Sequence, residues 1–206
     1  MDPRRLPRCR PPCVLRAVSQ RVRDREHLPR GATAGAGAPR RTGGAVRGSG
    51  PVNLHLLTVG KPARGPLADA STDYAKRLGR HVSLRERWVR SAHGAYGRDE
   101  LRRRESQALR DALPQQAMLV VLDERGERPG SVELARRIAH VRDNGTRELA
   151  LCIGGAHGHD EALRSHASWV WSLSPLTFPH EIARLLVLEQ LYRAFTILAG
   201  EPYHKA

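Results

Sequence analysis

No apolar run in this sequence approaches the ~20 residues that a membrane-spanning helix needs, so a membrane protein is not expected. Cysteine is also scarce, with three in 206 residues. Cys9 and Cys13 stand close together in CRPPC, but the two further ligands that a metal site would need are not evident nearby. Cys152 lies within an expected buried strand. We therefore expect no disulfide framework and no metal, and a reducing cytoplasm as the compartment.

Aromatic residues are missing from residues 1–51, which also lack a sustained apolar period. This segment holds twelve Arg and three acidic residues, a net charge of +9, whereas residues 52–206 carry a net charge of +5. It has too little apolar surface to fold and no secretory h-region. An Arg-rich start can indicate a transit peptide, although Pro and Gly disfavour the amphipathic helix. We expect a disordered Arg/Gly/Pro-rich extension, or an assigned start upstream of a natural one near Val52.

From residue 52 onward, strand-like and helix-like patterns alternate, and no internal repeat is visible. This alternation predicts an α/β fold, a mostly parallel sheet with helices on both faces. Ser131 is expected to cap the third helix, and Asn144-Gly145 to end it. The expected strands span 52–60, 82–89, 117–123, 148–155 and 168–174, and the expected helices span 66–80, 97–113, 131–145, 160–167 and 179–200.

Three loops follow expected strands at the edge where parallel sheets bind ligands: the turn after Leu122-Asp123, GGAHG at 154–158, and LSPLTFPH at 173–180. The glycine loop has neither G-x-G-x-x-G spacing nor a following Lys-Ser/Thr, so no pyrophosphate site is expected. Adjacent glycines let a backbone approach a flat ligand, such as an adenosyl group without phosphate, or simply form a tight turn. The third loop sets apolar residues beside Ser174 and Thr177, which suits a purine, or a proline-shaped connection.

The expected last helix, 179–200, is apolar nearly all round. Such a helix must be covered on more than one side. A partner subunit is a reasonable source of that cover, and we expect a dimer; the alternative is that the sheet and neighbouring helices suffice.

Four segments, LTVGK, VLDERGE, LCIGGAHG and WSLSPLTFPHEIARLLVLEQLYRAFTILAGEPYHK, closely resemble the RlmH-type methyltransferases of the SPOUT superfamily in order and spacing. The resemblance covers residues 52–206 and is most specific in 148–205. It supports Val52 as the natural start of a single methyltransferase domain. It implies a C-terminal trefoil knot, a homodimer, and methylation of N3 of a pseudouridine in helix 69 of 23S ribosomal RNA in the assembled ribosome.

The resemblance also implies that S-adenosylmethionine is the cofactor and that it sits in the knot. It assigns cofactor contacts to Leu122, Gly154, Leu173, Ser174, Pro175, Leu176, Thr177 and Phe178.

Methyl transfer to a ring nitrogen requires alignment of donor and acceptor and removal of the N3 proton. By the resemblance, the tail completes the partner subunit's pocket. His204 is then the first candidate for proton handling, Tyr203 for stacking on or bonding the base, and Lys205 for phosphate or carbonyl contact. His180 and Arg193 are further candidates, although His180 could cap or pack and Arg193 could pair with Glu189.

Several other interpretations remain open. The chain could be a non-catalytic ribosome- or RNA-binding protein that keeps the fold, and a nucleotide-binding oxidoreductase is disfavoured by the missing phosphate loop. His157 and His159 are expected as exposed loop histidines, more than as metal ligands with Cys152. Arg98, Arg102 and Arg110 could form a phosphate-facing row, but a solvated helix is favoured.

Overall fold

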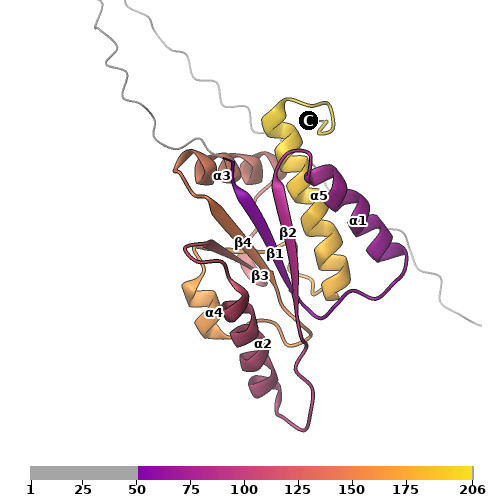
Figure 1. Ribbon diagram of the computed structural model, residues 1–206, viewed down its shortest axis with the longest axis vertical. Coiled ribbons are helices and arrows are strands. Elements are labelled where there is room, and N and C mark those ends of the chain that lie inside the picture. Colours follow the sequence, from indigo (N-terminus) through magenta and orange to yellow (C-terminus); the bar gives the residue numbers. More distant parts are fainter. Residues whose placement is uncertain (1–50, 206) are drawn as a thin grey trace, which may run out of the picture. The chain divides into compact units, whose positions relative to one another are not determined.

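The structure is a computed structural model that describes residues 51–205, so the predictions for residues 1–50 lie outside the described residues. Strands and helices alternate strictly along the chain, as expected (Figure 1). The elements are β1 (Asn53–Val59), α1 (Pro66–Leu78), β2 (Ser83–Val89), α2 (Arg98–Ala112), β3 (Met118–Glu127), α3 (Ser131–Asp143), β4 (Glu148–Ile153), α4 (Glu161–His166), β5 (Trp169–Trp171) and α5 (His180–Ala199).

The five strands form one parallel sheet in the order β2-β1-β4-β3-β5. Helices α1, α3 and α5 cover one face, and α2 and α4 cover the other (Figure 1). This confirms the predicted α/β class; the trefoil knot stays a prediction. None of the helices in the described part of the chain is long and apolar enough to cross a membrane.

Each central strand contributes side chains to two separate apolar cores, because successive side chains point to opposite faces of a sheet. In β1, Leu54 and Leu56 join the core beneath α1, α3 and α5, whereas Leu57 and Val59 join the core beneath α2 and α4. All four are at most 1% exposed. The continuous apolar runs that predicted central strands therefore arise because both faces are covered.

Strand β3 runs beyond its expected end at Asp123, to Glu127. The Ser172 amide donates a hydrogen bond of 2.8 Å to the Glu127 carbonyl, which extends the contact with β5. Gly126 permits this approach, because a Cβ there would stand 2.6 Å from the Val170 carbonyl oxygen. Strand β5 is correspondingly shorter than expected and ends at Trp171.

The predicted cap of α3 is wrong. Gly130 occupies the N-cap position, and Ser131 is the first helical residue. The Ser131 hydroxyl instead donates a 3.3 Å hydrogen bond to the amide oxygen of Gln190 on α5. The predicted stop is confirmed, since Asn144 is the C-cap and Gly145 follows with φ +79°.

Helix α5 packs between α1 and α3 on one face of the sheet (Figure 1). Its fully buried side chains include a charged one, Arg184, which pairs with Glu86 on the edge strand β2 at 2.7 Å. The sheet and flanking helices thus cover much of α5 within one chain. Its remaining apolar side chains are only half-buried, among them Leu185, Tyr192 and Leu198.

Candidate functional site

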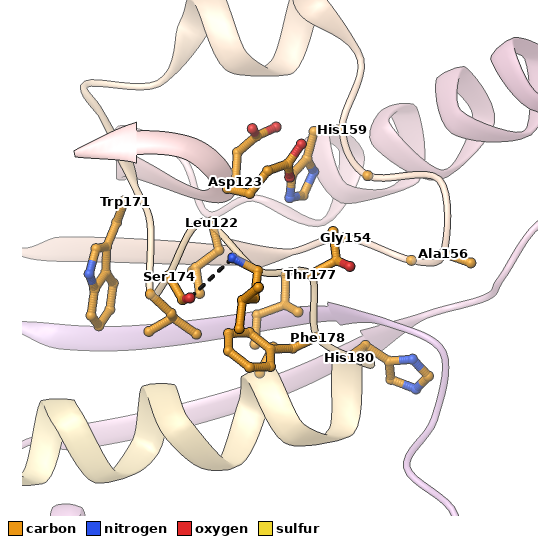
Figure 2. Close-up of a pocket in the computed structure, with 17 residues that line it drawn as sticks. Leu122, Asp123, Gly154, Ala156, His159, Trp171, Ser174, Thr177, Phe178 and His180 are labelled. Carbon is orange, nitrogen blue, oxygen red and sulfur yellow. Dashed lines mark hydrogen bonds between the residues drawn. The ribbon is translucent and has the colours of Figure 1, made fainter. Parts of the chain in front are cut away.

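A cavity of about 170 Å³ opens at the carboxyl ends of β3, β4 and β5 (Figure 2). Its walls come from the three loops that the strand order predicts at this edge. The loop 172–179 forms the outer wall, and Leu176 on it is 69% exposed. The lining residues are Leu122, Asp123, Glu124, Ile153, Gly154, Gly155, Ala156, Gly158, His159, Trp171, Leu173, Ser174, Leu176, Thr177, Phe178, His180 and Ala183.

The predicted cofactor residues come together here, with one exception. Pro175 is exposed and is not among the lining residues. The Ser174 hydroxyl accepts a hydrogen bond of 3.1 Å from the Leu176 amide, which fixes a local turn in the loop (Figure 2). The loop thereby presents backbone groups and apolar side chains to the cavity.

His159 lies against the glycine turn and lines the cavity, a role that the sequence analysis did not predict. It is 1% exposed, so the expectation of an exposed loop histidine is wrong. A Cβ on Gly154 would stand 3.1 Å from His159 Nε2. Neither ring nitrogen forms a hydrogen bond with another described residue. Burial lowers the pKa of His159 to about 4, which keeps the ring neutral at physiological pH.

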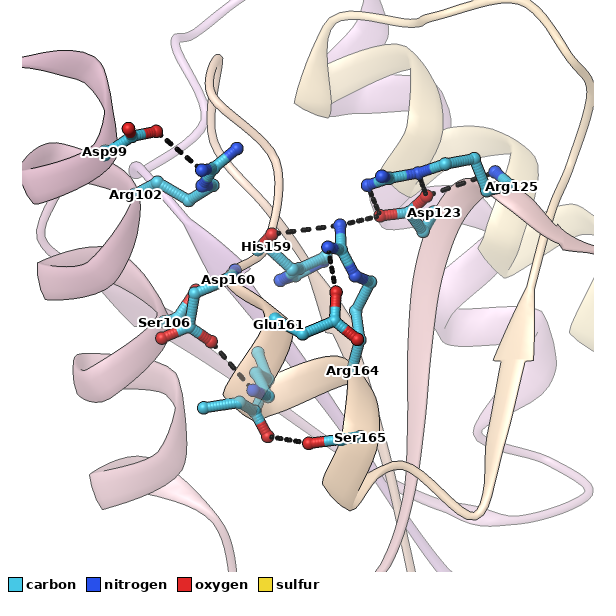
Figure 3. A network of polar contacts seen from close by, with 12 residues as sticks. Asp99, Arg102, Ser106, Asp123, Arg125, His159, Asp160, Glu161, Arg164 and Ser165 are labelled. Carbon is cyan, nitrogen blue, oxygen red and sulfur yellow. Dashed lines mark hydrogen bonds and ion pairs between the residues drawn. The ribbon is translucent and has the colours of Figure 1, made fainter.

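Asp123 closes the cavity on the side of α4. Its buried carboxylate accepts hydrogen bonds of 2.9 Å from Arg125 Nε and 3.1 Å from Arg164 (Figure 3). Burial by itself raises its pKa, but the hydrogen bonds from the two guanidinium groups and the Arg125 amide outweigh this and hold the pKa at about 2. Asp123 is therefore an ionised structural group, and it is no candidate for proton transfer near neutral pH.

A second buried carboxylate supports the glycine turn from α2. Glu105 is 4% exposed, and its Oε1 accepts a 3.0 Å hydrogen bond from the Ala92 amide. Its other oxygen would stand 2.6 Å from a Cβ on Gly155. Position 155 therefore requires glycine because a side chain there would collide with the buried carboxylate of Glu105.

His180 is the one predicted catalytic residue that lines this cavity. It is the first residue of α5, after the N-cap Pro179. Its ring lies beside the end of β1, where a Cβ on Gly60 would stand 3.4 Å from His180 Nε2. His180 therefore packs at the cavity mouth, next to the loops that follow β1 and β2.

The other predicted catalytic residues lie at or beyond the far end of α5. Tyr203 packs edge-on against Tyr192 with ring centroids 4.8 Å apart, and its hydroxyl donates a 3.1 Å hydrogen bond to Glu189. His180 is the first of the 20 residues of α5, and the tail follows the last of them. At 1.5 Å per residue that is roughly 30 Å, so Tyr203, His204 and Lys205 lie far from their own chain's cavity.

Arg193 makes the helix pair that was the alternative to a catalytic role. Its Nε donates a 3.1 Å hydrogen bond to Glu189, one helical turn away. Its guanidinium also lies 4.9 Å from the centroid of the Tyr203 ring. Burial, helped by Tyr74 and Glu189, raises the pKa of Tyr203, so its phenol stays protonated.

Within the described residues, no group of three or more His, Cys, Asp or Glu side chains could hold a metal. Cys152 is fully buried between β4 and the α2–α4 layer, and burial raises its thiol pKa to about 12. The proposed arginine row is also divided. Arg102 pairs with Asp99 and Arg110 with Asp160, which leaves Arg98 as the member without an ion pair among the described residues.

Known proteins similar to this chain fall in one family of methyltransferases. A family model described as a predicted SPOUT methyltransferase matches residues 52–204. Among curated proteins, ribosomal RNA large subunit methyltransferase H of Geotalea daltonii is 46% identical over 153 residues, which is 74% of this chain and 99% of that protein. The protein of the same name from Brucella anthropi is 42% identical over 160 residues, 75% of this chain and 100% of that protein.

Solved structures give weaker likenesses. A probable methylase family protein from Haemophilus influenzae aligns with a TM-score of 0.45 and 12% identity, over 75% of this chain and 71% of that chain. A putative methyltransferase from Legionella pneumophila, solved with bound S-adenosylmethionine, aligns with a TM-score of 0.37 and 13% identity, over 68% and 66%.

Proposed function

This chain belongs to the SPOUT methyltransferase family, and from that premise we propose that it transfers a methyl group from S-adenosylmethionine to large-subunit ribosomal RNA. The finer proposal is methylation of N3 of a pseudouridine in helix 69 of 23S RNA, in the assembled ribosome and in the cytoplasm. Relatives with over 40% identity across their whole length carry the name of a large-subunit ribosomal RNA methyltransferase. That identity is the main support for the RNA substrate.

The observation that carries the cofactor proposal is the cavity between the glycine turn and the 172–179 loop. A Cβ on Gly154 would meet the His159 ring and the Gly158 backbone at 3.1–3.2 Å, so a side chain there would require these neighbours to shift. His159 offers buried ring nitrogens without a hydrogen-bond partner in the described chain. A nucleoside with several hydroxyl and amino groups fits such a lining. Because about 170 Å³ is below the usual volume of a ligand pocket, we infer that the exposed loop at Leu176 moves outward on binding.

S-adenosylmethionine, when bound, supplies the methyl group on a positively charged sulfur. We assign Leu122, Gly154 and residues 173–178 to holding it through backbone groups and apolar contacts. Pro175 would contribute the shape of its loop, since it does not line the cavity. No charged side chain is required of the 173–178 loop, which has none.

The chain must also remove the proton from N3 of the target base. Asp123 is unsuited because two arginines hold its pKa at about 2. Tyr203 is unsuited as a base because its pKa is raised, but its protonated phenol can donate to a carbonyl of the base. The imidazoles of His204 and His180 remain, and we assign proton acceptance to His204. Lys205 and Arg193 would stabilise negative charge on the base or its phosphate.

These assignments require a second subunit. The tail and the cavity of one chain are separated by the length of α5, roughly 30 Å. In a homodimer, the tail of one chain can reach the cavity of the other. The half-buried apolar side chains on α5 offer surface for such an interface.

A methyl-transfer assay tests the proposal. Purified protein, labelled S-adenosylmethionine and large ribosomal subunits lacking the modification should give labelled RNA, and mass spectrometry of fragments should place the methyl group in helix 69. Gly154→Leu should lose cofactor binding and transfer. Gly130→Leu is the matched control, since a Cβ there meets nothing within 4 Å.

Two results would count against the proposal. A wild-type protein that ignores S-adenosylmethionine but binds ribosomes would favour the non-catalytic alternative. A methyl group on another nucleotide would retain the methyltransferase but refute the helix 69 assignment.

A further inference from the structure

Two loops beside the cavity carry positive charge without acidic residues. The loop after β1, residues 60–65, contains Lys61 and Arg64, and the stretch after β2, residues 90–98, contains Arg90, His93 and Arg98. Neither stretch contains Asp or Glu. The side chains of these five basic residues are exposed. We call Lys61, Arg64, Arg90, His93 and Arg98 the basic face.

The two loops leave the sheet side by side. Val59 and Val89 are partners in the β1–β2 register, and the Gly60 amide donates a 2.9 Å hydrogen bond to the Val89 carbonyl. A Cβ on Gly60 would lie 3.0 Å from Ser91 Oγ and 3.4 Å from His180 Nε2. His180 lines the cavity, so the basic face begins at the cavity mouth. Figure 1 shows both loops at the lower edge of the sheet.

Most acidic side chains near these loops bind loop amides or arginines of α2 and not the five residues of the basic face. Glu181 accepts a 3.0 Å hydrogen bond from the Ala63 amide, and Glu105 accepts one from the Ala92 amide. Asp99 and Glu100, which follow Arg98, pair with arginines of α2. Asp69, one turn into α1, is the remaining acid in sequence near either loop. Glu181 and Glu105 therefore fix the loop backbones, while the side chains of the basic face are exposed and form no ion pair among the described residues.

The same stretch carries an exposed aromatic ring. Tyr96 is 46% exposed, and the Arg104 guanidinium lies 3.8 Å from its ring centroid. Exposed aromatic rings among unpaired cations are typical of surfaces that contact single-stranded RNA, where bases stack and phosphates pair. A protein partner would need a matching acidic surface, whereas RNA offers phosphates for the cations and bases for the ring.

We propose that the basic face binds the phosphates of the RNA strand that flanks the target nucleotide, with Tyr96 as a stacking platform. The proposal rests on the proposed function, because it takes the RNA substrate as the ligand. It adds which part of this chain holds that substrate: the β1–α1 and β2–α2 loops of the subunit whose cavity is used. It accounts for a free cationic patch that the cofactor site does not use.

The test compares two pairs of substitutions with the same chemistry. Arg64→Gln/Arg90→Gln removes two charges from the basic face. Arg136→Gln/Arg147→Gln removes two charges from exposed positions on α3 and just before β4, and neither residue lines the cavity. Binding to purified large ribosomal subunits is measured against salt concentration without S-adenosylmethionine. Methyl transfer and cofactor binding are measured separately.

The basic-face pair should weaken binding to the subunits about tenfold. It should also make the slope of log affinity against log salt concentration less steep, by about one to two. Its KM for subunits should rise while kcat and the cofactor Kd stay within about twofold. The control pair should change binding less than about twofold. Equal losses in both pairs, or no loss in the basic-face pair, would overturn the proposal.

The binding arm separates this inference from the proposed function. If the wild type binds subunits but transfers no methyl group, the proposed function fails. The comparison of the two pairs then still decides whether the basic face holds RNA.

Discussion

The Glu105 carboxylate joins the glycine turn of the cavity to the loop after β2. One oxygen accepts the Ala92 amide at 3.0 Å, and the other would stand 2.6 Å from a Cβ on Gly155. A single buried side chain on α2 thus supports two of the loops at the carboxyl edge of the sheet.

Gly155→Ala should push Glu105 away from Ala92 and lower the free energy of unfolding by about 1–3 kcal/mol, as overpacking does. Urea denaturation measures this. Gly130→Ala, where the added methyl meets nothing within 4 Å, should cost less than about 1 kcal/mol. The double variant Glu105→Ala/Gly155→Ala should lose less than the sum of its single changes. Strict additivity would show that the contact is not the cause.

Arg184→Met should destabilise the fold by about 3 kcal/mol, because it leaves the carboxylate of Glu86 without its partner under α5. Arg184→Met/Glu86→Met should recover most of that loss, since replacing both members of a buried pair removes the uncompensated charge. Urea unfolding of the three variants provides the comparison. A double variant as unstable as Arg184→Met would contradict this explanation.

His159 should make stability fall as the pH drops from about 6.5 to about 4. Its pKa is about 4 in the folded protein and 6.5 ordinarily, so the unfolded chain binds a proton in this window and the native chain does not. The loss totals about 3 kcal/mol. His159→Gln should remove this part of the slope, whereas the exposed His140→Gln should keep it. An unchanged slope in His159→Gln would contradict the buried neutral ring.

Asp123 should act at lower pH, and its pKa is likewise lowered in the folded protein. Its pKa is held at about 2, below the ordinary 3.8, so its contribution is complete above about pH 4 and is lost as the pH falls toward 2. Asp123→Asn should reduce the slope in this lower window, to which the lowered pKa of Asp160 also contributes, as measured by denaturation at fixed pH values. A change in slope between pH 4 and 6.5 would point to another group.

Mixed dimers test whether the tail works in the partner's cavity. One subunit carries Gly154→Leu and an intact tail, and the other lacks residues 203–206 but has an intact cavity. Each homodimer should be inactive, and the mixture should recover transfer at the one site that combines the intact cavity with the intact tail. A mixture as inactive as its parents, with mixed dimers shown by mass, would place the tail in its own subunit.

Local patterns in the sequence were sufficient to predict the order of strands and helices. Central strands such as β4 are apolar on both faces, and α5 is apolar nearly all round, so both patterns follow from burial alone. The three cavity loops follow from the rule that parallel strands end at one edge. The cofactor residues on those loops came from the family resemblance.

Contacts between segments that are distant in sequence could not be predicted from these local patterns. The extension of β3 to Glu127 depends on where Ser172 lies, 45 residues later in the chain. His159 follows Gly158, whose φ is +69°, and is buried against Gly154 four residues before Gly158. The helix begins one residue earlier than expected, with Gly130 as N-cap, and the Ser131 hydroxyl donates to Gln190 on α5. Each outcome is set by tertiary packing, which residue types in sequence order do not specify.

The most direct test is mass spectrometry of 23S ribosomal RNA from cells with and without the gene. We predict that a fragment from helix 69 loses the mass of one methyl group on deletion, and that the wild-type gene restores it while Gly154→Leu does not. A helix 69 fragment of identical mass in both cells would contradict the account.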